Sequence, residues 1–239
     1  MKIALIGYGK MGKAIEDEAM ARGHEIVLRA GRVWDVNNLS GADVAIEFSR
    51  PESAEENILR CFDMDIPVIV GTTGWYHLYP EIKEKAQLEN RSMLTASNFS
   101  IGVNLFFKLN EQLAKLMNPH AEYDVIMNEI HHTKKLDAPS GTAITLAEGI
   151  LDHLDRKKKW VGLMADTKET GSSFDLKIIS HRLEDIPGTH IVSYGSEIDE
   201  ITISHIARSR KGFALGAVIA AEWLKGRKGV FTMNDVLNL

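Results

Sequence analysis

The sequence contains a single cysteine, Cys61, among its 239 residues. One cysteine excludes an intrachain disulfide framework and any metal site built from thiolates alone. No apolar stretch is long enough to span a bilayer, and the apolar run at residues 3–6 lacks the architecture of a signal peptide. From these absences we expect a soluble, cytoplasmic, globular protein.

The chain also lacks a strong charge of either sign. Its net charge is −5, and acidic and basic residues are mixed along its length. The only basic run, residues 157–159, follows an expected helix, and we interpret it as a solvated helix end. This pattern favours neither a nucleic-acid interface nor a membrane-binding surface. We therefore expect neither a nucleic-acid partner nor an association with a membrane.

The first half of the sequence alternates between strand-like and helix-like segments. The expected strands are residues 2–6, 25–28, 43–48, 67–70 and 92–96, and the expected helices are residues 11–21, 51–61 and 81–87. Strands separated by single helices are typical of a parallel, doubly wound α/β sheet of the Rossmann type.

The second half has a different pattern. Leu105, Leu109, Leu113 and Leu116 form one stripe of an expected helix, and a second helix is expected at residues 140–154. The expected strands are residues 123–130, 174–181, 190–194 and 200–206. Because the last strands follow one another without helices, we predict an α+β domain with a mostly antiparallel sheet. The Ala- and Gly-rich helix at residues 213–224 is expected to pack on the first domain or on a partner subunit.

A glycine motif stands between the first strand and the first helix. Residues 7–12 read G-Y-G-K-M-G, which is the dinucleotide-binding spacing in its required strand–turn–helix context. Gly7 would permit the tight turn, Gly9 would let the backbone approach a pyrophosphate, and Gly12 would let helix and strand pack closely. The competing interpretation is a glycine-rich turn without a ligand.

Cofactor choice is expected at the end of the second strand. An NAD-selective site usually has an acidic residue there, whereas this chain has Arg29 and Arg32, and its next acidic residue is Asp35. Arginine suits a ribose 2′-phosphate, so we expect NADPH to bind at least as well as NADH. The alternative is that both arginines are only solvated.

Two further loops follow expected parallel strands. Residues 71–74, Gly-Thr-Thr-Gly, and residues 96–99, Ala-Ser-Asn-Phe, stand where such sheets bind ligands. We expect the first loop beside the nicotinamide ribose and the ring of Phe99 over the nicotinamide. Ordinary connecting loops remain the alternative for both.

Residues 129–143 combine two histidines and a lysine with a Ser-Gly-Thr helix start. Histidine can give or take a proton near neutral pH, and a helix start offers backbone N–H groups to an anion. If the preceding strand stays extended, Glu129 and His131 share one face and His132 points to the other. This geometry disfavours a metal ion held by both histidines. Solvated histidines are the remaining alternative.

In their order, these motifs resemble the dihydrodipicolinate reductase (4-hydroxy-tetrahydrodipicolinate reductase) family. The resemblance rests on GYGKMG, VAIEFSRPE, GTTG, SNFSIGVN and EIHHTKKLDAPSGTA, and it extends over nearly the whole chain. It implies an NAD(P)H-dependent oxidoreductase that reduces 4-hydroxy-tetrahydrodipicolinate, with loss of water, in the diaminopimelate route to lysine. It also implies a homotetramer, a dinucleotide-binding domain (residues 1–100 and 211–239) and a substrate-binding and oligomerisation domain (residues 101–210).

The resemblance assigns residues position by position. His131 and Lys135 match the catalytic pair, and which of them delivers the proton stays open. The substrate contacts would be His132, Gly141 and Thr142, and the cofactor contacts Gly7, Tyr8, Gly9, Lys10, Met11, Gly12, Gly71, Thr72, Thr73, Ala96, Ser97, Asn98 and Phe99. No metal is implied. The segment after Arg29 is short, and Glu184 stands where many members have glycine. A nicotinamide-binding sensor without turnover is disfavoured, because every catalytic position of the motif is filled.

Overall fold

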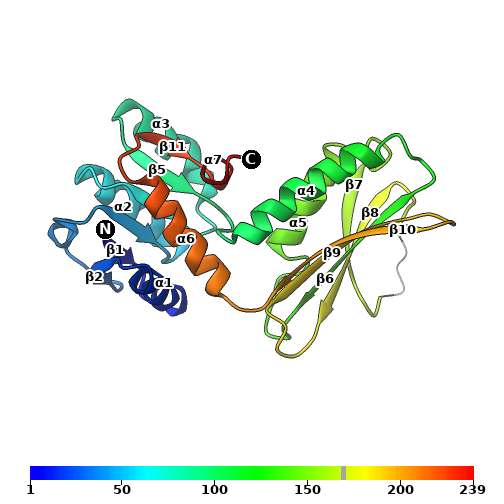
Figure 1. The fold of residues 1–239 in the computed structure, drawn as a ribbon, viewed down its shortest axis with the longest axis horizontal. Helices are drawn as coiled ribbons and strands as arrows, with labels where there is room; N and C mark the ends of the chain where they lie inside the picture. The colour runs from blue at the N-terminus through cyan, green and yellow to red at the C-terminus, as the bar shows by residue number, and fades with distance from the viewer. Residues whose placement is uncertain (168–170) are drawn as a thin grey trace. The chain divides into compact units, whose positions relative to one another are not determined.

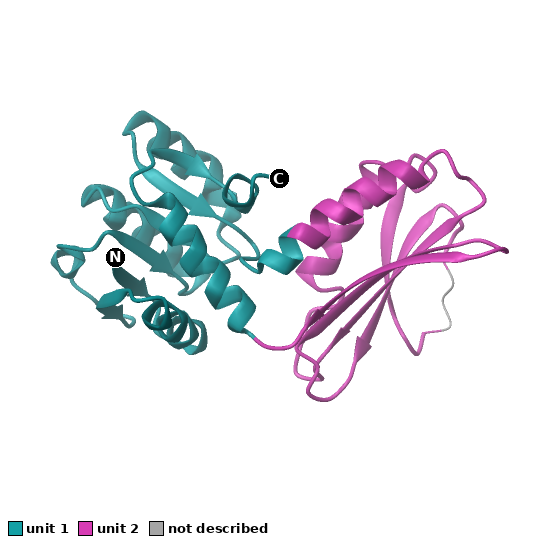
Figure 2. Ribbon diagram, in the orientation of Figure 1, with its two compact units in different colours: residues 1–104, 210–239 teal, residues 105–209 magenta. Residues whose placement is uncertain are grey.

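A computed structural model describes residues 1–167 and 171–239. The chain forms two compact units (Figure 1), Met1–Asn104 with Arg210–Leu239 and Leu105–Ser209 (Figure 2). Each unit is built around its own β-sheet. Among the described residues, no helix combines the length and the apolar character needed to cross a membrane.

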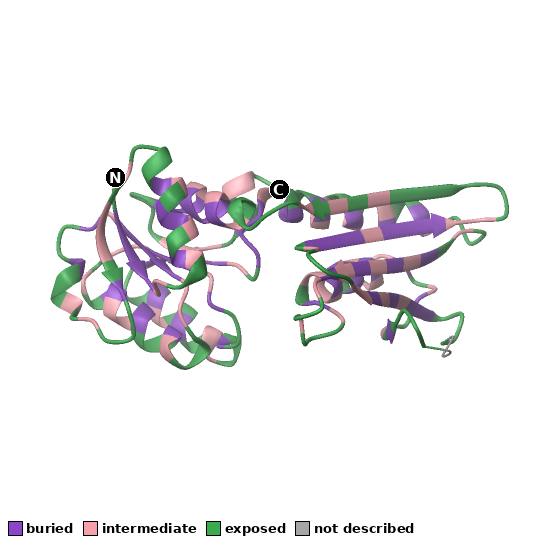
Figure 3. Cartoon of the chain, turned by 90° about the horizontal axis from the view of Figure 1, so that it is seen from below, coloured by how far each residue is buried: buried purple, intermediate pink, exposed green. Residues whose placement is uncertain are grey.

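The first unit contains a six-stranded sheet in which every pairing is parallel. Its strands, in spatial order, are β11 (Gly229–Phe231), β5 (Ser92–Thr95), β4 (Val68–Val70), β3 (Val44–Glu47), β1 (Lys2–Ile6) and β2 (Glu25–Ala30). Its main helices are α1 (Lys10–Ala21), α2 (Pro51–Asp63), α3 (Tyr79–Leu88) and α6 (Lys211–Leu224). The inner strands are buried along their length (Figure 3), which is why they read as continuous apolar runs. The predicted Rossmann-like sheet is confirmed.

The end of the chain completes this unit. Helix α6 packs into the same core as α1, as expected from its small residues. A Cβ at Gly216 would lie 1.7 Å from the carbonyl oxygen of Phe99, so only glycine permits this approach. Strand β11 and the short helix α7 (Met233–Leu237) were not predicted from the sequence, although Thr232 and Asp235 form a capping box at the start of α7.

The second unit has a five-stranded mixed sheet. Its spatial order is β10 (Glu200–Ala207), β9 (Gly188–Gly195), β6 (Asp124–His131), β8 (Asp175–Arg182) and β7 (Lys159–Met164). Strand β9 pairs antiparallel with β6 and β10, whereas β8 pairs parallel with β6 and β7. The expectation of a mostly antiparallel sheet is corrected to a mixed one. Strand β6 pairs parallel with β8 after the crossover that contains helix α5 (Gly141–Leu151), and β7, which the sequence pattern did not indicate, adds a second parallel pair.

The run of lysines at residues 157–159 leads into β7, and it is not only the solvated helix end that we expected. Lys157 is buried, and its Nζ donates to the carbonyl oxygens of Ser173 (2.7 Å) and Asp175 (3.1 Å). The same ammonium lies 2.6 Å from Oδ1 of Asp124. These partners satisfy the buried charge.

Helix α4 (Ile101–Met117) has the predicted helical period, but the leucine stripe is not its core-facing side. Leu105, Leu109 and Leu116 are exposed, whereas Phe106 and Met117 are buried in the core of the second unit. Apolar residues on both sides of the helix explain why the pattern alone did not identify the buried side.

Candidate active site

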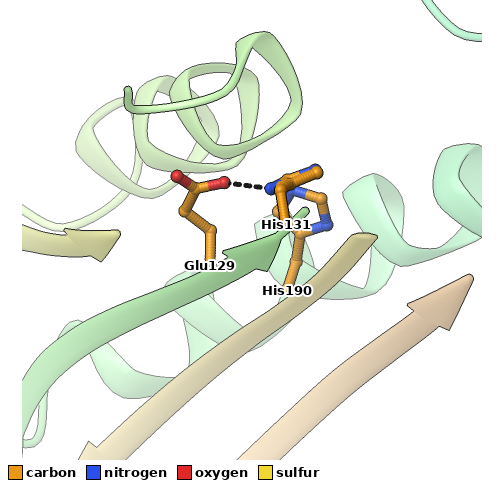
Figure 4. Close-up of side chains that lie close together, drawn as sticks. All are labelled: Glu129, His131 and His190. Carbon is orange, nitrogen blue, oxygen red and sulfur yellow. Dashed lines mark ion pairs between the residues drawn. The ribbon is translucent and has the colours of Figure 1, made fainter. Parts of the chain in front are cut away.

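The predicted proton donor lies at the end of strand β6. His131 is the last residue of this strand and is 8% exposed, while Glu129, two residues earlier, is completely buried. The Oε2 of Glu129 forms an ion pair with Nδ1 of His131 (Figure 4). The prediction that these two residues share a face is therefore confirmed. His132 follows the end of the strand.

A second histidine, not identified from the sequence, lies against the first. His190 stands opposite Glu129 in the pairing of β9 with β6, and its ring centroid is 5.2 Å from that of His131. Figure 4 shows both rings beside the carboxylate of Glu129. Burial, with a smaller contribution from the nearby charge of His131, lowers the pKa of His190 to about 3. His190 is therefore a neutral imidazole at pH 7.

His190 connects His131 to the predicted anion site. Its Nε2 lies 3.0 Å from Oγ of Ser140, the residue that caps helix α5 and accepts a hydrogen bond from the backbone N–H of Ala143 (3.2 Å). Gly141 and Thr142 form the start of α5, where the helix dipole favours a negative charge. The structure thus brings the candidate proton donor and the candidate carboxylate site together through side-chain contacts.

Lys135 lies in the loop between β6 and α5. Its backbone N–H donates to the carbonyl oxygen of His132 (3.0 Å), which closes a turn, and its Nζ lies 2.8 and 2.9 Å from the two carboxylate oxygens of Asp137. The hydrogen bond from Lys135 lowers the pKa of Asp137. The ammonium of Lys135 is therefore held by a local carboxylate on the loop that follows His131.

The ligand atoms of Glu129, His131 and His190 lie within 4.8 Å of one another, which is close enough to share a metal ion. The carboxylate of Glu129, however, already contacts His131 through one oxygen and Nη1 of Arg182 (2.8 Å) through the other. A divalent cation would meet the guanidinium charge of Arg182 on the same carboxylate. The donor set is therefore better satisfied by hydrogen bonds than by a cation.

The glycine motif in the first unit has the geometry of a phosphate-binding turn. Gly7 has φ +94°, and a Cβ there would lie 2.1 Å from the carbonyl oxygen of Phe48. A Cβ at Gly12 would lie 2.3 Å from the carbonyl oxygen of Gly7. Gly9 precedes α1, and a Cβ there would meet no described heavy atom within 4 Å. The turn is therefore close-packed on one side and open at Gly9, as a bound pyrophosphate requires.

The loops after β4 and β5 lie at the carboxyl edge of the same sheet. Thr72 is buried and accepts a hydrogen bond from the backbone N–H of Ser49 (2.7 Å), while Thr73 is exposed. A Cβ at Gly71 would lie 2.1 Å from the ring of Phe48. The ring of Phe99 packs against Phe48 with centroids 5.7 Å apart and is 2% exposed. Contrary to our expectation, the Phe99 ring is part of the core and is not available to cover a nicotinamide.

The two arginines after β2 have different environments. Arg29 forms an ion pair with Glu16 of α1, and the hydroxyl of Tyr8 donates to the same carboxylate. Arg32 lies in the exposed bend that follows β2. Among the described residues, an ion pair with a carboxylate is found for Arg29 and not for Arg32, and the sequence pattern did not indicate Glu16 as the partner.

Comparisons with known proteins cover both units. Residues 1–99 match the family model described as dihydrodipicolinate reductase, N-terminus, and residues 102–237 match dihydrodipicolinate reductase, C-terminus. The chain is 48% identical to the 4-hydroxy-tetrahydrodipicolinate reductase of Christiangramia forsetii, over 100% of this chain and 98% of the relative. It is 40% identical to that of Chromobacterium violaceum, over 84% of this chain and 75% of the relative.

The fold has a similar counterpart among solved structures. The dihydrodipicolinate reductase of Paenisporosarcina sp. TG-14, solved with dipicolinate bound, superposes with a TM-score of 0.76. The match covers 97% of each chain at 22% sequence identity, so it supports the fold alone.

Proposed function

The chain belongs to the dihydrodipicolinate reductase family, and from this premise we propose how its residues perform the reaction. The protein is an oxidoreductase that uses a nicotinamide nucleotide to reduce 4-hydroxy-tetrahydrodipicolinate in the diaminopimelate route to lysine. We assign proton delivery to one member of the pair His131 and Lys135. The observation that carries this assignment is the buried His131, paired with Glu129 and linked through His190 and Ser140 to the start of α5.

The substrate is a cyclic dicarboxylate, so the site must hold two negative charges. We propose that the backbone N–H groups of Gly141 and Thr142 bind one carboxylate and that His132 contacts the other. This assignment is supported by the position of Gly141 and Thr142 at the dipole-positive end of α5.

The reduction adds one hydride and one proton after water has left the ring. The nicotinamide nucleotide supplies the hydride when bound. We propose that His131 or Lys135 delivers the proton to the electron-rich enamine that hydride addition leaves. The ammonium of Lys135 would also balance the negative charge that develops on the ring. A water-excluded location strengthens both effects, and His131 is buried.

For the cofactor, we propose that the turn containing Gly7, Gly9 and Gly12 binds the pyrophosphate. Tyr8, Lys10 and Met11 belong to the same turn and helix start, and the loops at residues 71–73 and 96–99 would contact the nicotinamide half, with Phe99 contributing its backbone. We propose that both NADPH and NADH are used, with Arg29 and Arg32 near the ribose 2′ position.

We further propose that the first unit binds the cofactor and that the second binds substrate and assembles a homotetramer in the cytoplasm. Strand β10 is an edge strand of its sheet and exposes Ile201 and Ile206, which supports an interface on the second unit. Light scattering coupled to size-exclusion chromatography tests the assembly.

The proposed reaction is tested by following nicotinamide absorbance with enzymatically generated substrate, in parallel with NADPH and NADH. We expect substrate-dependent oxidation of both. Cofactor binding without turnover would instead identify a nicotinamide-binding sensor. Turnover that persists in His131→Gln would leave the reaction intact but overturn the assignment of His131.

A further inference from the structure

Glu129 is a completely buried carboxylate, and each of its two oxygens contacts a nitrogen of a neighbouring side chain. Oε2 faces Nδ1 of His131, and Oε1 accepts a hydrogen bond from Nη1 of Arg182 (2.8 Å). Burial alone would raise the pKa of Glu129, but hydrogen bonds from His131, Ser180 and Arg182 together outweigh it and lower the pKa to about 2. The carboxylate is therefore ionised at pH 7 and can only accept hydrogen bonds.

An acceptor-only partner determines the tautomer of an imidazole. Because the anionic Oε2 of Glu129 lies against Nδ1, this contact is favourable only when that nitrogen of His131 carries a hydrogen, and Nε2 is then the atom that can gain or release a proton. A Cβ at Gly188 would lie 3.0 Å from that Nε2. The glycine therefore keeps the space beside the reactive nitrogen clear.

Arg182 holds this arrangement in place. It is the register partner of His131 on the parallel strand β8, and its side chain is largely buried. Its Nη2 donates to the carbonyl oxygen of Asp137 (2.6 Å), and the side chain of Asp137 holds Lys135. One guanidinium thus links the carboxylate behind His131 to the loop that carries Lys135.

We propose that Glu129, anchored by Arg182, is a positioning residue that fixes His131 with Nε2 as the proton-delivering atom. The inference rests on the proposed role of His131 and deepens it by naming the reacting nitrogen and the residue that selects it. Glu129 itself has no contact with the substrate in this proposal and acts only through the imidazole.

The test is a double-mutant cycle with Glu129→Gln and His131→Gln. The amide preserves the shape of Glu129 but removes its charge and can donate as well as accept, so it no longer enforces one tautomer. We expect Glu129→Gln to lower kcat about 10- to 100-fold, a fraction of a general acid's usual contribution. The KM for substrate and the Kd for dipicolinate should stay within about twofold, because neither carboxylate contact changes. The solvent deuterium isotope effect on kcat should increase.

The double variant separates the possible failures. If Glu129 acts only through His131, adding Glu129→Gln to His131→Gln should lower kcat no further. Multiplicative losses, or a normal kcat in Glu129→Gln beside an impaired His131→Gln, would overturn the positioning role. A normal kcat in His131→Gln would instead overturn the proposed role of His131.

Two further measurements distinguish the positioning role of Glu129 from a loss of activity that is caused only by poor folding of the variant. Asp124→Asn removes another carboxylate from β6, where it pairs with the buried Lys157, and it should lower Tm while leaving kcat within about twofold. In the wild-type protein, ¹⁵N chemical shifts of His131 at a pH where the ring is neutral should report a hydrogen on Nδ1. A hydrogen on Nε2 would overturn the proposal even if Glu129→Gln does not fold.

Discussion

Arg29 reaches from the end of β2 to α1, where its Nε lies 2.8 Å from Oε1 of Glu16. The hydroxyl of Tyr8, a residue of the glycine motif, donates to the same carboxylate. These hydrogen bonds, that from Arg29 foremost, lower the pKa of Glu16, so the carboxylate remains charged at neutral pH. A ribose 2′-phosphate that binds Arg29 must therefore compete with Glu16.

This competition predicts the effect of Glu16→Gln on cofactor preference. Without the carboxylate charge, Arg29 is available to a 2′-phosphate, so the ratio of kcat/KM for NADPH to that for NADH should rise about tenfold, or about 1.4 kcal/mol. Steady-state kinetics with both cofactors measure the ratio. Asp17→Asn removes one charge from the exposed side of the same helix and should leave the ratio unchanged. An unchanged ratio in Glu16→Gln would show that Arg29 does not meet the 2′ position.

Most of the first unit could be predicted from the sequence, because short local patterns mark its strands and its first turn. Buried parallel strands are continuous apolar runs, and the glycine motif marks the turn between β1 and α1. Strand β11 has only three residues, and β7 has a single buried residue, Leu163, among exposed and half-buried ones, so neither produced a recognisable period. Without β7, the parallel pairing of β7 with β8 could not be anticipated, whereas the expected helix between the strands at residues 123–130 and 174–181 is compatible with the parallel pairing of β6 with β8.

The candidate site was predictable only where its residues are neighbours in sequence. His131, Lys135 and the start of α5 lie within one short segment. His190 and Arg182 reach the same place only through the pairing of β6 with β9 and β8. Strand register is set by the whole sheet, and no local pattern around His190 or Arg182 indicates it.

The assignment of the carboxylate site predicts a binding defect without a folding defect in Gly141→Ala. The added methyl would meet no described heavy atom within 4 Å, and alanine is a better helix former than glycine, so Tm should not fall. The methyl would, however, occupy space at the helix start that a carboxylate needs. Calorimetric titration with dipicolinate should show a Kd raised about tenfold. Glu148→Ala, on the exposed side of α5, should bind normally; equal affinities would argue against this anion site.

Neighbouring lysines provide a matched test of the proposed charge at Lys135. Lys135→Gln should lower kcat at least tenfold, because it removes both a proton source and a positive charge beside the ring. Lys134→Gln removes the same charge from the adjacent, exposed position and should leave kcat within about twofold. Initial rates at saturating cofactor distinguish the two. Equal effects would indicate a general electrostatic contribution in place of a specific role.

The cluster of Glu129, His131 and His190 predicts activity that survives metal removal. Arg182 lies 2.8 Å from Glu129 and provides the positive charge that a cation would otherwise supply. Dialysis against EDTA should therefore leave kcat and KM unchanged when the assay is run in metal-free buffer. Loss of activity that is restored by added zinc would show that the three side chains bind a functional ion.

His190 predicts a defined pH window for stability. Its pKa is about 3 in the folded protein against 6.5 for an exposed histidine, so between these values the unfolded chain binds a proton that the folded chain does not. The free energy of unfolding should therefore fall as the pH drops below 6.5, by about 2 kcal/mol at pH 5. Glu129 acts in the same sense but in a lower window, because its depressed pKa stabilises the folded protein above pH 4.5 and this contribution is lost as the pH falls toward 2. Urea unfolding of wild type and His190→Gln at pH 7.5 and pH 5 isolates the effect. The variant should be the less stable protein at pH 7.5, since it loses the packing of the imidazole. The difference between the two should then narrow by about 2 kcal/mol at pH 5, since glutamine cannot take up the proton. Parallel pH dependences would show that His190 is not held neutral by the fold.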